Sequence, residues 1–331
     1  MRHLLERGHW IRLFARHAEN DCAQWAAGVE PRPGDVSEPT TVRGCAEGCD
    51  AVLHIVGVVA ESPPDVTFET INVAGTRLIL EEAERAGVRR FVYVSSLGAD
   101  RGRSEYHRSK KQGEDLVRAF PGDWIICRAG NVYGPGDKVI SLLLKLVRTL
   151  PVIPVPGGGD DPFQPIWADD LGRALALAVE RSDLARQTLE LAGAETTTLN
   201  EVLDHLERLT GKSPARLPLP GWLASIGAEA ASTVGVDLPV TTDQITMLLE
   251  GNVIQPGRPN ALVDVLGITP TPLADGLAKL ADSLPEQLPS EGQGTLYRRR
   301  YWADVRNSRI TPEQLMERFR ERFSALVPNS T

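Results

Sequence analysis

The sequence predicts an α/β fold in which a parallel, doubly wound sheet is followed by a small helical C-terminal lobe. Three apolar runs of strand length, at residues 51–57, 89–96 and 124–128, are typical of strands that are covered on both faces. Segments with helical periodicity separate these runs. Strands that alternate with helices indicate repeated βαβ units, and such sheets bind ligands at the carboxyl ends of their strands.

The first part of the chain adds one strand and two helices. Residues 10–14 form a short β-type run, and proline and glycine then punctuate the sequence as far as Gly34-Asp35-Val36. A brief helix is expected at 41–48. Apolar residues recur at helical spacing between 65 and 87, where Gly87 is a suitable helix end.

The later elements are less regular. Helices are expected at 104–120, 138–150 and 168–181, with a proline- and glycine-rich loop at 151–165 and a strand at 188–191. From Leu199 onward the sequence is helical and rich in turns, without a further buried strand. We therefore expect a sheet domain over 1–195, a small lobe over 196–286, and a linker with a basic amphipathic helical tail over 287–331.

Composition and charge exclude several classes of protein. The chain has 331 residues, of which 42% are apolar and 24% charged, and its net charge is −8, so it is an ordinary globular chain. An acidic chain does not match the phosphate backbone of nucleic acid, so we expect a small-molecule partner and no nucleic acid. Neither the N-terminus nor residues 139–155 suit a signal peptide or a membrane span.

The cysteines indicate a reducing compartment. Cys22, Cys45, Cys49 and Cys127 are too few and too irregularly spaced for a disulfide framework, which favours the cytoplasm. Cys45 and Cys49 have no second Cys/His pair at ligand spacing. We therefore expect two half-buried thiols there and no metal.

A tyrosine and a lysine at helical spacing provide the first chemical signal. Tyr106 and Lys110 are four residues apart and so share one face of a helix. An ammonium favours the phenolate and so lowers the pKa of a nearby phenol, which lets the phenol act as an acid and base in hydride transfer. Ser95 and Ser96 end the preceding strand, where a hydroxyl can polarise a substrate carbonyl.

With these residues in place, the sequence resembles the extended and atypical short-chain dehydrogenase/reductases, also called NAD-dependent epimerase/dehydratase-like proteins, whose sheet is of the Rossmann type. The later part is most similar to the branch that includes the nucleotide-binding accessory subunit of mitochondrial complex I. The resemblance covers roughly residues 1–284. The stretches that carry it are Gly34-Asp35-Val36, 50–57, 72–76, 91–96, 106–110, 128–136, 154–159, 163–170, 241–253 and 266–271.

The resemblance implies a role for several residues. Tyr106 is the acid/base, Lys110 its partner on the cofactor ribose, and Ser96, with Ser95 as the near alternative, the carbonyl donor. Three further residues are implied to bind the cofactor: Asp35 and Val36 flank the adenine, and Gly57 lets the dinucleotide lie close to the sheet. Arg16 occupies the position where NADP binders of this family place a cation, which favours NADP(H) over NAD(H); a solvent-exposed loop arginine is the alternative.

Two departures from the family pattern stand out. Only ten residues separate Ser96 from Tyr106, whereas ordinary extended members have a longer loop that helps to wall the substrate site. We therefore expect either an open site or a relic of one. The family's glycine-rich phosphate loop and the strand before it are also absent ahead of Leu4, so we expect that Met1 is a mis-assigned start or a truncation point.

Three further motifs have alternative interpretations. Gly157-Gly-Gly159 is followed by two aspartates that would repel phosphate, so a tight turn is favoured over a phosphate loop. Asp169 and Asp170 are expected to cap a helix and favour its dipole, in preference to acid/base work. Asn72 fits a proton relay and a structural polar contact equally well.

The tail has its own pattern. Eight arginines against four acids lie in residues 297–331, and Leu315, Phe319, Phe323 and Leu326 recur at helical spacing. Such a helix suits an anionic membrane surface, although docking on the acidic body of the same chain is favoured. Two functions follow from the sequence as a whole: an NAD(P)-dependent oxidoreductase or epimerase-like enzyme, and a non-catalytic NADPH-binding assembly or sensor protein.

Overall fold

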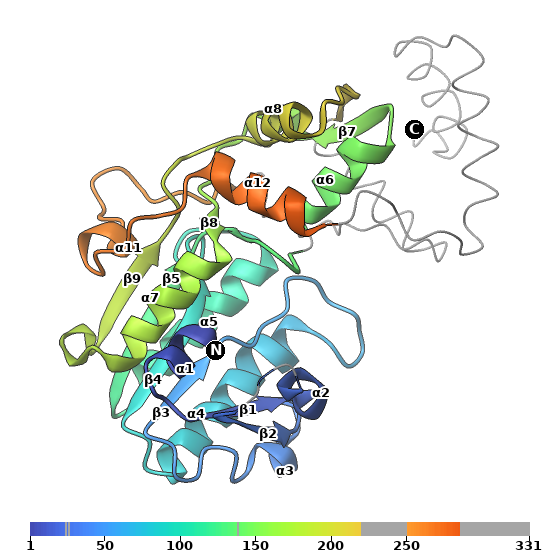
Figure 1. The fold of residues 1–331 in the computed structure, drawn as a ribbon. Coiled ribbons are helices and arrows are strands. Elements are labelled where there is room, and N and C mark those ends of the chain that lie inside the picture. The colour runs from blue at the N-terminus through green and yellow to red at the C-terminus, as the bar shows by residue number, and fades with distance from the viewer. Residues whose placement is uncertain (24, 26, 138, 220–249, 285–331) are drawn as a thin grey trace, which may run out of the picture.

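The computed structural model describes residues 1–331 except 24, 26, 138, 220–249 and 285–331. Within the described part, a larger body contains parallel strands with helices on both faces (Figure 1). A smaller lobe, formed by α6, α8, α12 and β7, lies at one end of this body. The basic tail expected at 287–331 lies outside the described residues.

The main sheet has four parallel strands in the order β3-β4-β5-β9. They are β3 (Ala51–His54), β4 (Arg90–Ser96), β5 (Asp123–Ala129) and β9 (Gln187–Leu191). The two middle strands, β4 and β5, are buried over nearly their whole length, which explains their continuous apolar sequences. All four strands coincide with predicted runs, and the predicted α/β class with a parallel sheet is confirmed.

A second, two-stranded parallel sheet pairs β1 (Ile11–Ala15) with β2 (Val29–Pro33). The sequence predicts β1 but not β2, because prolines at positions 31 and 33 argue against a strand. Proline is tolerated in β2 because this strand is paired on one side only within the described residues. β1 and β3 also each have one edge without a strand partner among those residues.

Helices cover both faces of the main sheet and enclose two apolar cores. One face is covered by α4 (Gly75–Arg85) and α5 (Glu105–Arg118), the other by α7 (Ala168–Glu180) and α11 (Ala261–Asp264). Side chains of β4 alternate between the two, with Phe91 and Tyr93 in the first core and Val92 in the second. A π-helix, η1 (Phe68–Ala74), precedes α4 directly and forms the start of the predicted helix.

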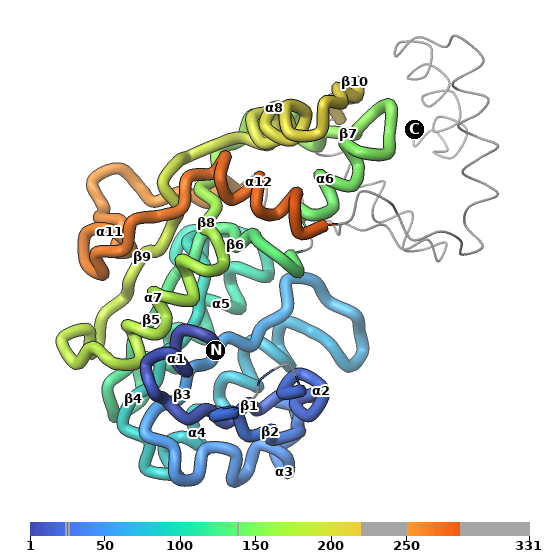
Figure 2. Tube along the Cα trace, viewed as in Figure 1, coloured from blue at the N-terminus to red at the C-terminus, as the bar shows by residue number. Residues whose placement is uncertain are grey.

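The smaller lobe encloses a third core and contains an unpredicted pair of strands. Its elements are α6 (Ile140–Thr149), β7 (Val152–Pro156), α8 (Leu199–Thr210), β10 (Ala215–Leu219) and α12 (Leu273–Ser283). The prediction of a loop at 151–165 is wrong in its first part, because β7 pairs in parallel with β10. Figure 2 shows α6, α8 and α12 close together, and their core draws on residues on both sides of position 196. The domain limits given above stay a prediction.

The remaining elements are short. Two of them bear on predicted motifs. The turn η2 contains Gly157, Gly158 and Gly159, all with positive φ between 66° and 82°, as the tight-turn interpretation expects. Asp169 and Asp170 lie in the first turn of α7, as predicted, but the N-cap is Trp167. The other short elements are α1 (Arg2–Glu6), α2 (Ala18–Cys22), α3 (Pro39–Val42), β6 (Val132–Tyr133), β8 (Ile166–Trp167) and η3 (Ser182–Leu184).

Three observations concern metals, disulfides and membranes. The four cysteines are free thiols, and Cys22, Cys45 and Cys127 are buried while Cys49 is partly buried. Among the described residues, no group of three or more His, Cys, Asp or Glu side chains is arranged to hold a metal ion. In the same part of the chain, no helix combines the length and the hydropathy that crossing a bilayer requires.

Candidate active site

Ser95 and Ser96, the last two residues of β4, point to opposite sides of the strand and have different partners. The Ser95 hydroxyl donates a hydrogen bond of 2.7 Å to the buried carboxylate of Glu114. The Ser96 side chain is hydrogen-bonded to the phenol of Tyr106 in the first turn of α5. Of the two serines predicted as carbonyl donors, the fold therefore brings Ser96 to the tyrosine.

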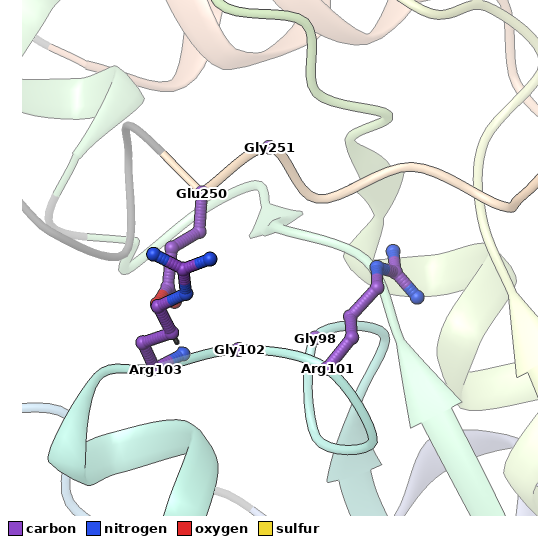
Figure 3. Close-up of a pocket in the computed structure, with 6 residues that line it drawn as sticks. All are labelled: Gly98, Arg101, Gly102, Arg103, Glu250 and Gly251. Atoms are coloured by element: carbon purple, nitrogen blue, oxygen red, sulfur yellow. Dashed lines mark hydrogen bonds between the residues drawn. The ribbon is translucent and has the colours of Figure 1, made fainter.

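The connection between Ser96 and Tyr106 is short and closely packed. Backbone hydrogen bonds from Ala99 to Ser96 and from Gly102 to Gly98 close it into successive turns. A cavity of about 350 Å³ lies beside it, lined on the other side by Glu250 and Gly251 (Figure 3). The short loop thus borders a cavity whose lining contains neither Ser96 nor Tyr106.

Burial dominates the electrostatics of Tyr106. It raises the pKa of the phenol to about 12, and the hydrogen bond with Ser96 opposes this rise only in part. The sequence-based expectation that Lys110 lowers the pKa of Tyr106 is therefore wrong for the protein without cofactor. The physical reason is that the ring lies in an apolar environment, with its edge toward Phe68 at a centroid distance of 6.1 Å.

Lys110 is buried and lies at the junction of α5, β4 and the end of β3. Its ammonium group is 4.3 Å from the centroid of the Tyr93 ring, and a Cβ placed on Gly57 would be 3.5 Å from Nζ. Burial lowers the pKa of Lys110 to about 7, and the carboxylate of Glu114 opposes this shift. A lysine that titrates near neutrality can be charged when an anionic or polyhydroxyl ligand is bound and neutral without it.

Asn72 makes structural contacts with all of its amide groups. Its Oδ1 accepts a hydrogen bond of 2.8 Å from the Val58 amide, and its Nδ2 donates to the Val58 carbonyl and to the Ser109 hydroxyl. Its hydrogen bonds therefore connect η1 and α5 to the segment that follows β3. Of the two interpretations of Asn72, the structure favours the structural polar contact. The π-helical turn that carries it is a rare conformation often found near functional sites.

Four predicted cofactor-binding residues line one cavity of about 210 Å³ between the ends of β1, β2 and β3. They are Arg16, Asp35, Val36 and Gly57, and the rest of the lining is largely apolar. A Cβ on Gly57 would lie 3.3 Å from Asn72 Oδ1, so the bare backbone keeps this wall open. The apolar lining suits an adenine ring. Arg16 in the lining and Lys110, whose Nζ lies near Gly57, suit phosphate and ribose groups, so the residues fit a nicotinamide dinucleotide.

The two charged residues of this cavity face each other. The Nε of Arg16 is 3.9 Å from Asp35 Oδ2, and 67% of the Arg16 side chain is exposed. Burial alone would raise the pKa of Asp35, but hydrogen bonds from the Ser37 amide and hydroxyl, together with Arg16, lower it overall. Arg16 thus has a free face toward solvent at the rim of the cavity, and its orientation is guided by a weak ion pair.

The structure adds residues that the sequence did not indicate. His107, next to Tyr106, is buried against Ser96, and Glu250 reaches it from the C-terminal part of the chain. Ser104 was a usable signal for the start of α5, because its side chain caps the helix by accepting from the His107 amide, but this signal does not mark the His107 side chain. No local signal marks Glu250, because 143 positions separate it from His107.

Comparisons with known proteins agree with this geometry. A family model described as NAD(P)H-binding matches residues 1–141. The sterol demethylase protein B of Methylococcus capsulatus is 30% identical over 246 residues, covering 66% of this chain and 73% of that protein. The chain belongs to the extended and atypical short-chain dehydrogenase/reductases.

Two further relatives match over a smaller share of their own length. The ceramide reductase of Caulobacter vibrioides is 31% identical over 200 residues, or 60% of this chain. The chain spans 62% of that reductase, less than two thirds of its length. Subunit 9 of the NADH dehydrogenase [ubiquinone] 1 alpha subcomplex of Rattus norvegicus is 25% identical over 240 residues, covering 72% of this chain and 63% of the subunit.

Solved structures of the same fold contain a bound dinucleotide. A structure of MoeE5 with UDP-glucose and NAD superposes with a TM-score of 0.61 at 21% identity, covering 82% of this chain and 97% of the other. The dTDP-glucose 4,6-dehydratase DesIV of Streptomyces venezuelae, with NAD and TYD bound, gives a TM-score of 0.64 at 20% identity and covers 85% of this chain and 91% of its own. At these identities the likeness establishes the Rossmann-type fold of this dehydrogenase/reductase.

Proposed function

We propose that this dehydrogenase/reductase transfers a hydride between a nicotinamide dinucleotide and a substrate carbonyl or carbinol. The observation that carries the proposal is the contact between Ser96 and Tyr106 at the carboxyl end of β4, with Lys110 one turn along the same helix. Ligands of such sheets bind at this end of the strands. The cavity that contains Arg16, Asp35, Val36 and Gly57 supports binding of the dinucleotide to the same edge.

Each of the three residues has a distinct task in this proposal. The nicotinamide, when bound, supplies or accepts the hydride. Ser96 donates a hydrogen bond to the substrate oxygen, and Tyr106 exchanges a proton with that oxygen at its phenol. Lys110 binds the ribose hydroxyls in its charged form and so favours the phenolate of Tyr106, which offsets the effect of burial.

The preferred cofactor in this proposal is NADP(H). The exposed guanidinium of Arg16 stands at the rim of the adenine-side cavity, where a 2′-phosphate would accept charge-assisted hydrogen bonds. The Oδ1 atom of Asp35 accepts from the Ser37 amide and hydroxyl, and its Oδ2 faces Arg16 at 3.9 Å. The free thiols also support the cytoplasmic location that we propose.

The test replaces Tyr106 by phenylalanine, which keeps the ring and removes the hydroxyl. Oxidation of NADPH is followed with menadione, an oxidised ceramide and a keto-sterol, the last two because named relatives act in ceramide and sterol chemistry. We expect turnover to fall at least about a hundredfold while NADPH binding is retained. Unchanged turnover in Tyr106→Phe would reject the proposal.

A non-catalytic role is the second candidate. One observation favours it: without cofactor, the pKa of Tyr106 is raised to about 12, which is a poor value for an acid or base at neutral pH. The 25% identity to a complex I accessory subunit points in the same direction. Under this alternative the protein would copurify with NADPH, and none of the three carbonyl compounds would oxidise it.

A further inference from the structure

His107 connects the proposed active site to a glutamate from a distant part of the chain. The imidazole is almost fully buried, with 1% of the residue exposed. Its Nε2 is 3.2 Å from Ser96 Oγ, and its Nδ1 is 2.7 Å from Glu250 Oε2. Ser96 also contacts the Tyr106 phenol, so four side chains form a continuous line of hydrogen bonds.

The charge of Glu250 determines which nitrogen of His107 carries the proton in the neutral ring. Burial raises the pKa of Glu250, but hydrogen bonds from His107 and from the amides of Arg103 and Ser104 lower it overall, so it is a carboxylate. A carboxylate can only accept, and Nδ1 must therefore donate to it. Nε2 then has a lone pair that accepts from the Ser96 hydroxyl while no substrate oxygen takes that hydrogen bond.

Close packing holds the ring of His107 in this orientation. A Cβ added to Gly98 would lie 2.3 Å from Nε2, and one added to Gly102 would lie 2.3 Å from Nδ1. Both glycines therefore lie directly against the imidazole. Ser104 adds a contact of 2.9 Å to Nδ1. A ring fixed on both sides keeps its two nitrogens directed at Ser96 and Glu250.

The far end of this line opens into the cavity of about 350 Å³ beside the Ser96–Tyr106 loop. Glu250 and Gly251 form one wall, and Arg101, Gly102 and Arg103 form the other (Figure 3). The line of hydrogen bonds thus runs from the phenol of Tyr106 to a space large enough for water. Asn72 offers no comparable route, because the Val58 backbone and Ser109 occupy its amide.

We propose that Ser96, His107 and Glu250 form a proton relay that exchanges protons between Tyr106 and water in this cavity. The inference rests on the proposed function, because it assigns the source of the proton that Tyr106 uses. In carbinol oxidation, the carbinol carbon gives its hydride to NAD(P)+ and the Tyr106 phenolate accepts the hydroxyl proton. Once the carbonyl product has left, Tyr106 passes this proton to Ser96 while Ser96 passes its own to the Nε2 lone pair of His107, and Nδ1 releases its proton to Glu250 or a water beside it. Carbonyl reduction runs the same transfers in reverse, starting from the ring with its proton on Nε2.

Among the residues that the structure describes, few other charged or titratable groups face His107. From its own helix the Tyr106 ring lies at 5.3 Å between centroids, and from the opposite segment Glu250 is the charged neighbour. The loop contributes Arg101 and Arg103, whose side chains line the cavity. The relay therefore has one carboxylate to stabilise its cationic state and one phenol to receive the proton.

The direct test is NMR of the histidine ring nitrogens in the full-length protein without cofactor. We expect the neutral ring of His107 to carry its proton on Nδ1. Glu250→Gln should move the Nδ1 resonance, and Ser96→Ala should move the Nε2 resonance. Glu180→Gln is the matched control, because Glu180 pairs with His9 at 2.9 Å. This variant should move only the ring-nitrogen resonances of His9. A proton on Nε2, or resonances of His107 that respond to neither variant, would overturn the relay.

The second test measures the turnover rate, with NADPH and menadione as the probe compounds. We expect His107→Gln, which keeps a donor and an acceptor at the site, to lower kcat at least about tenfold and to change the solvent isotope effect. Substituted imidazoles should rescue His107→Gly in order of their basicity, which a space-filling role would not produce. The control His9→Gln should match the wild type. If Tyr106→Phe is inactive but His107→Gln keeps the wild-type rate and isotope effect, the relay is overturned and the proposed function stands. If Tyr106→Phe is active, the proposed function itself is overturned.

Discussion

Arg128 and Glu114 form a buried two-point ion pair, with Nε to Oε1 and Nη2 to Oε2 both at 2.8 Å. The same carboxylate accepts the Ser95 hydroxyl, so the pair joins β4, β5 and α5 at the carboxyl edge of the sheet. Asp100 accepts from Arg128 and also from Arg258 of the C-terminal segment. This network fixes Ser95 and thereby directs Ser96 to the opposite side, toward Tyr106.

Glu114→Gln should destabilise the protein by about 2–4 kcal/mol, because it leaves the buried guanidinium of Arg128 with too little negative charge. Urea unfolding at neutral pH measures the effect. The neighbouring Asp115→Asn is the control, since Asp115 is exposed and its loss should cost less than about 0.5 kcal/mol. Equal effects of the two variants would contradict the assignment.

Acid should bring the stabilities of the wild type and Glu114→Gln closer together. Burial raises the pKa of Glu114, but its bonds with Arg128 and Ser95 lower it overall, so the stabilisation by this carboxylate is complete above its ordinary pKa. It is lost as the pH falls toward the lower folded-state value. The wild type should therefore lose more free energy of unfolding than Glu114→Gln when both are acidified. If the free energy of unfolding of the wild type and of Glu114→Gln depended on pH in the same way, Glu114 would not be an ion-pair partner.

Lys110→Met should remove a dependence of stability on alkaline pH. The pKa of Lys110 is lowered from 10.5 to about 7 in the folded protein, so between these values the unfolded chain binds more protons. The free energy of unfolding of the wild type should rise with pH in this window, by up to about 1.4 kcal/mol per pH unit. Lys111→Met, next in sequence but exposed, should keep this slope. A wild-type curve that is flat over this range would argue against a buried ammonium.

Arg16→Ser should lower the affinity for NADPH about tenfold and leave the affinity for NADH within about twofold, because one charge-assisted hydrogen bond to the 2′-phosphate is lost. Fluorescence titration of both cofactors gives the two values. Arg32→Ser, on the exposed end of β2 outside the cavity, serves as the control. A loss of equal size for both cofactors would mean that Arg16 shapes the cavity and does not recognise the phosphate.

Asn72→Asp should destabilise the fold by about 2–3 kcal/mol. The variant places a carboxylate oxygen where the amide now donates to the Val58 carbonyl, which leaves both oxygens facing each other in a buried site. Thermal unfolding measures the change, and Asn20→Asp, at an exposed position of α2, is the matched control. If Asn72→Asp has the same Tm as the wild type, the hydrogen bonds of Asn72 do not stabilise the contact between η1 and the end of β3.

The sequence predicts the main sheet well because its strands are buried on both faces and therefore read as apolar runs. It fails at β2 and β7, where proline is compatible with a strand that is paired on one side or lies at the edge of a small sheet. The composition of a short segment does not show which strand it pairs with or on how many sides. The same limit applies to the lobe, whose third core joins residues from both sides of α7.

The site is predicted in part. The spacing of Tyr106 and Lys110 and the two serines of β4 lead to the correct edge of the sheet, but the choice between Ser95 and Ser96 depends on Glu114, which lies in the body of α5. The pKa of Tyr106 is missed because burial depends on tertiary packing. Glu250 is missed because its contact with His107 forms only when distant segments meet.

The edges of β1 and β3 that lack a strand partner among the described residues have a measurable dynamic consequence. In β4 and β5, hydrogen bonds on both sides protect the amides, whereas half of the amides of β3 point away from its single partner. Native-state hydrogen exchange should therefore be fast at alternate positions of 51–54 and slow throughout 91–93, which both β3 and β5 flank. Because the loop after β3 carries Gly57 and Val58, a rapidly exchanging edge strand of the main sheet would adjoin the proposed cofactor cavity, and bound dinucleotide should slow its exchange.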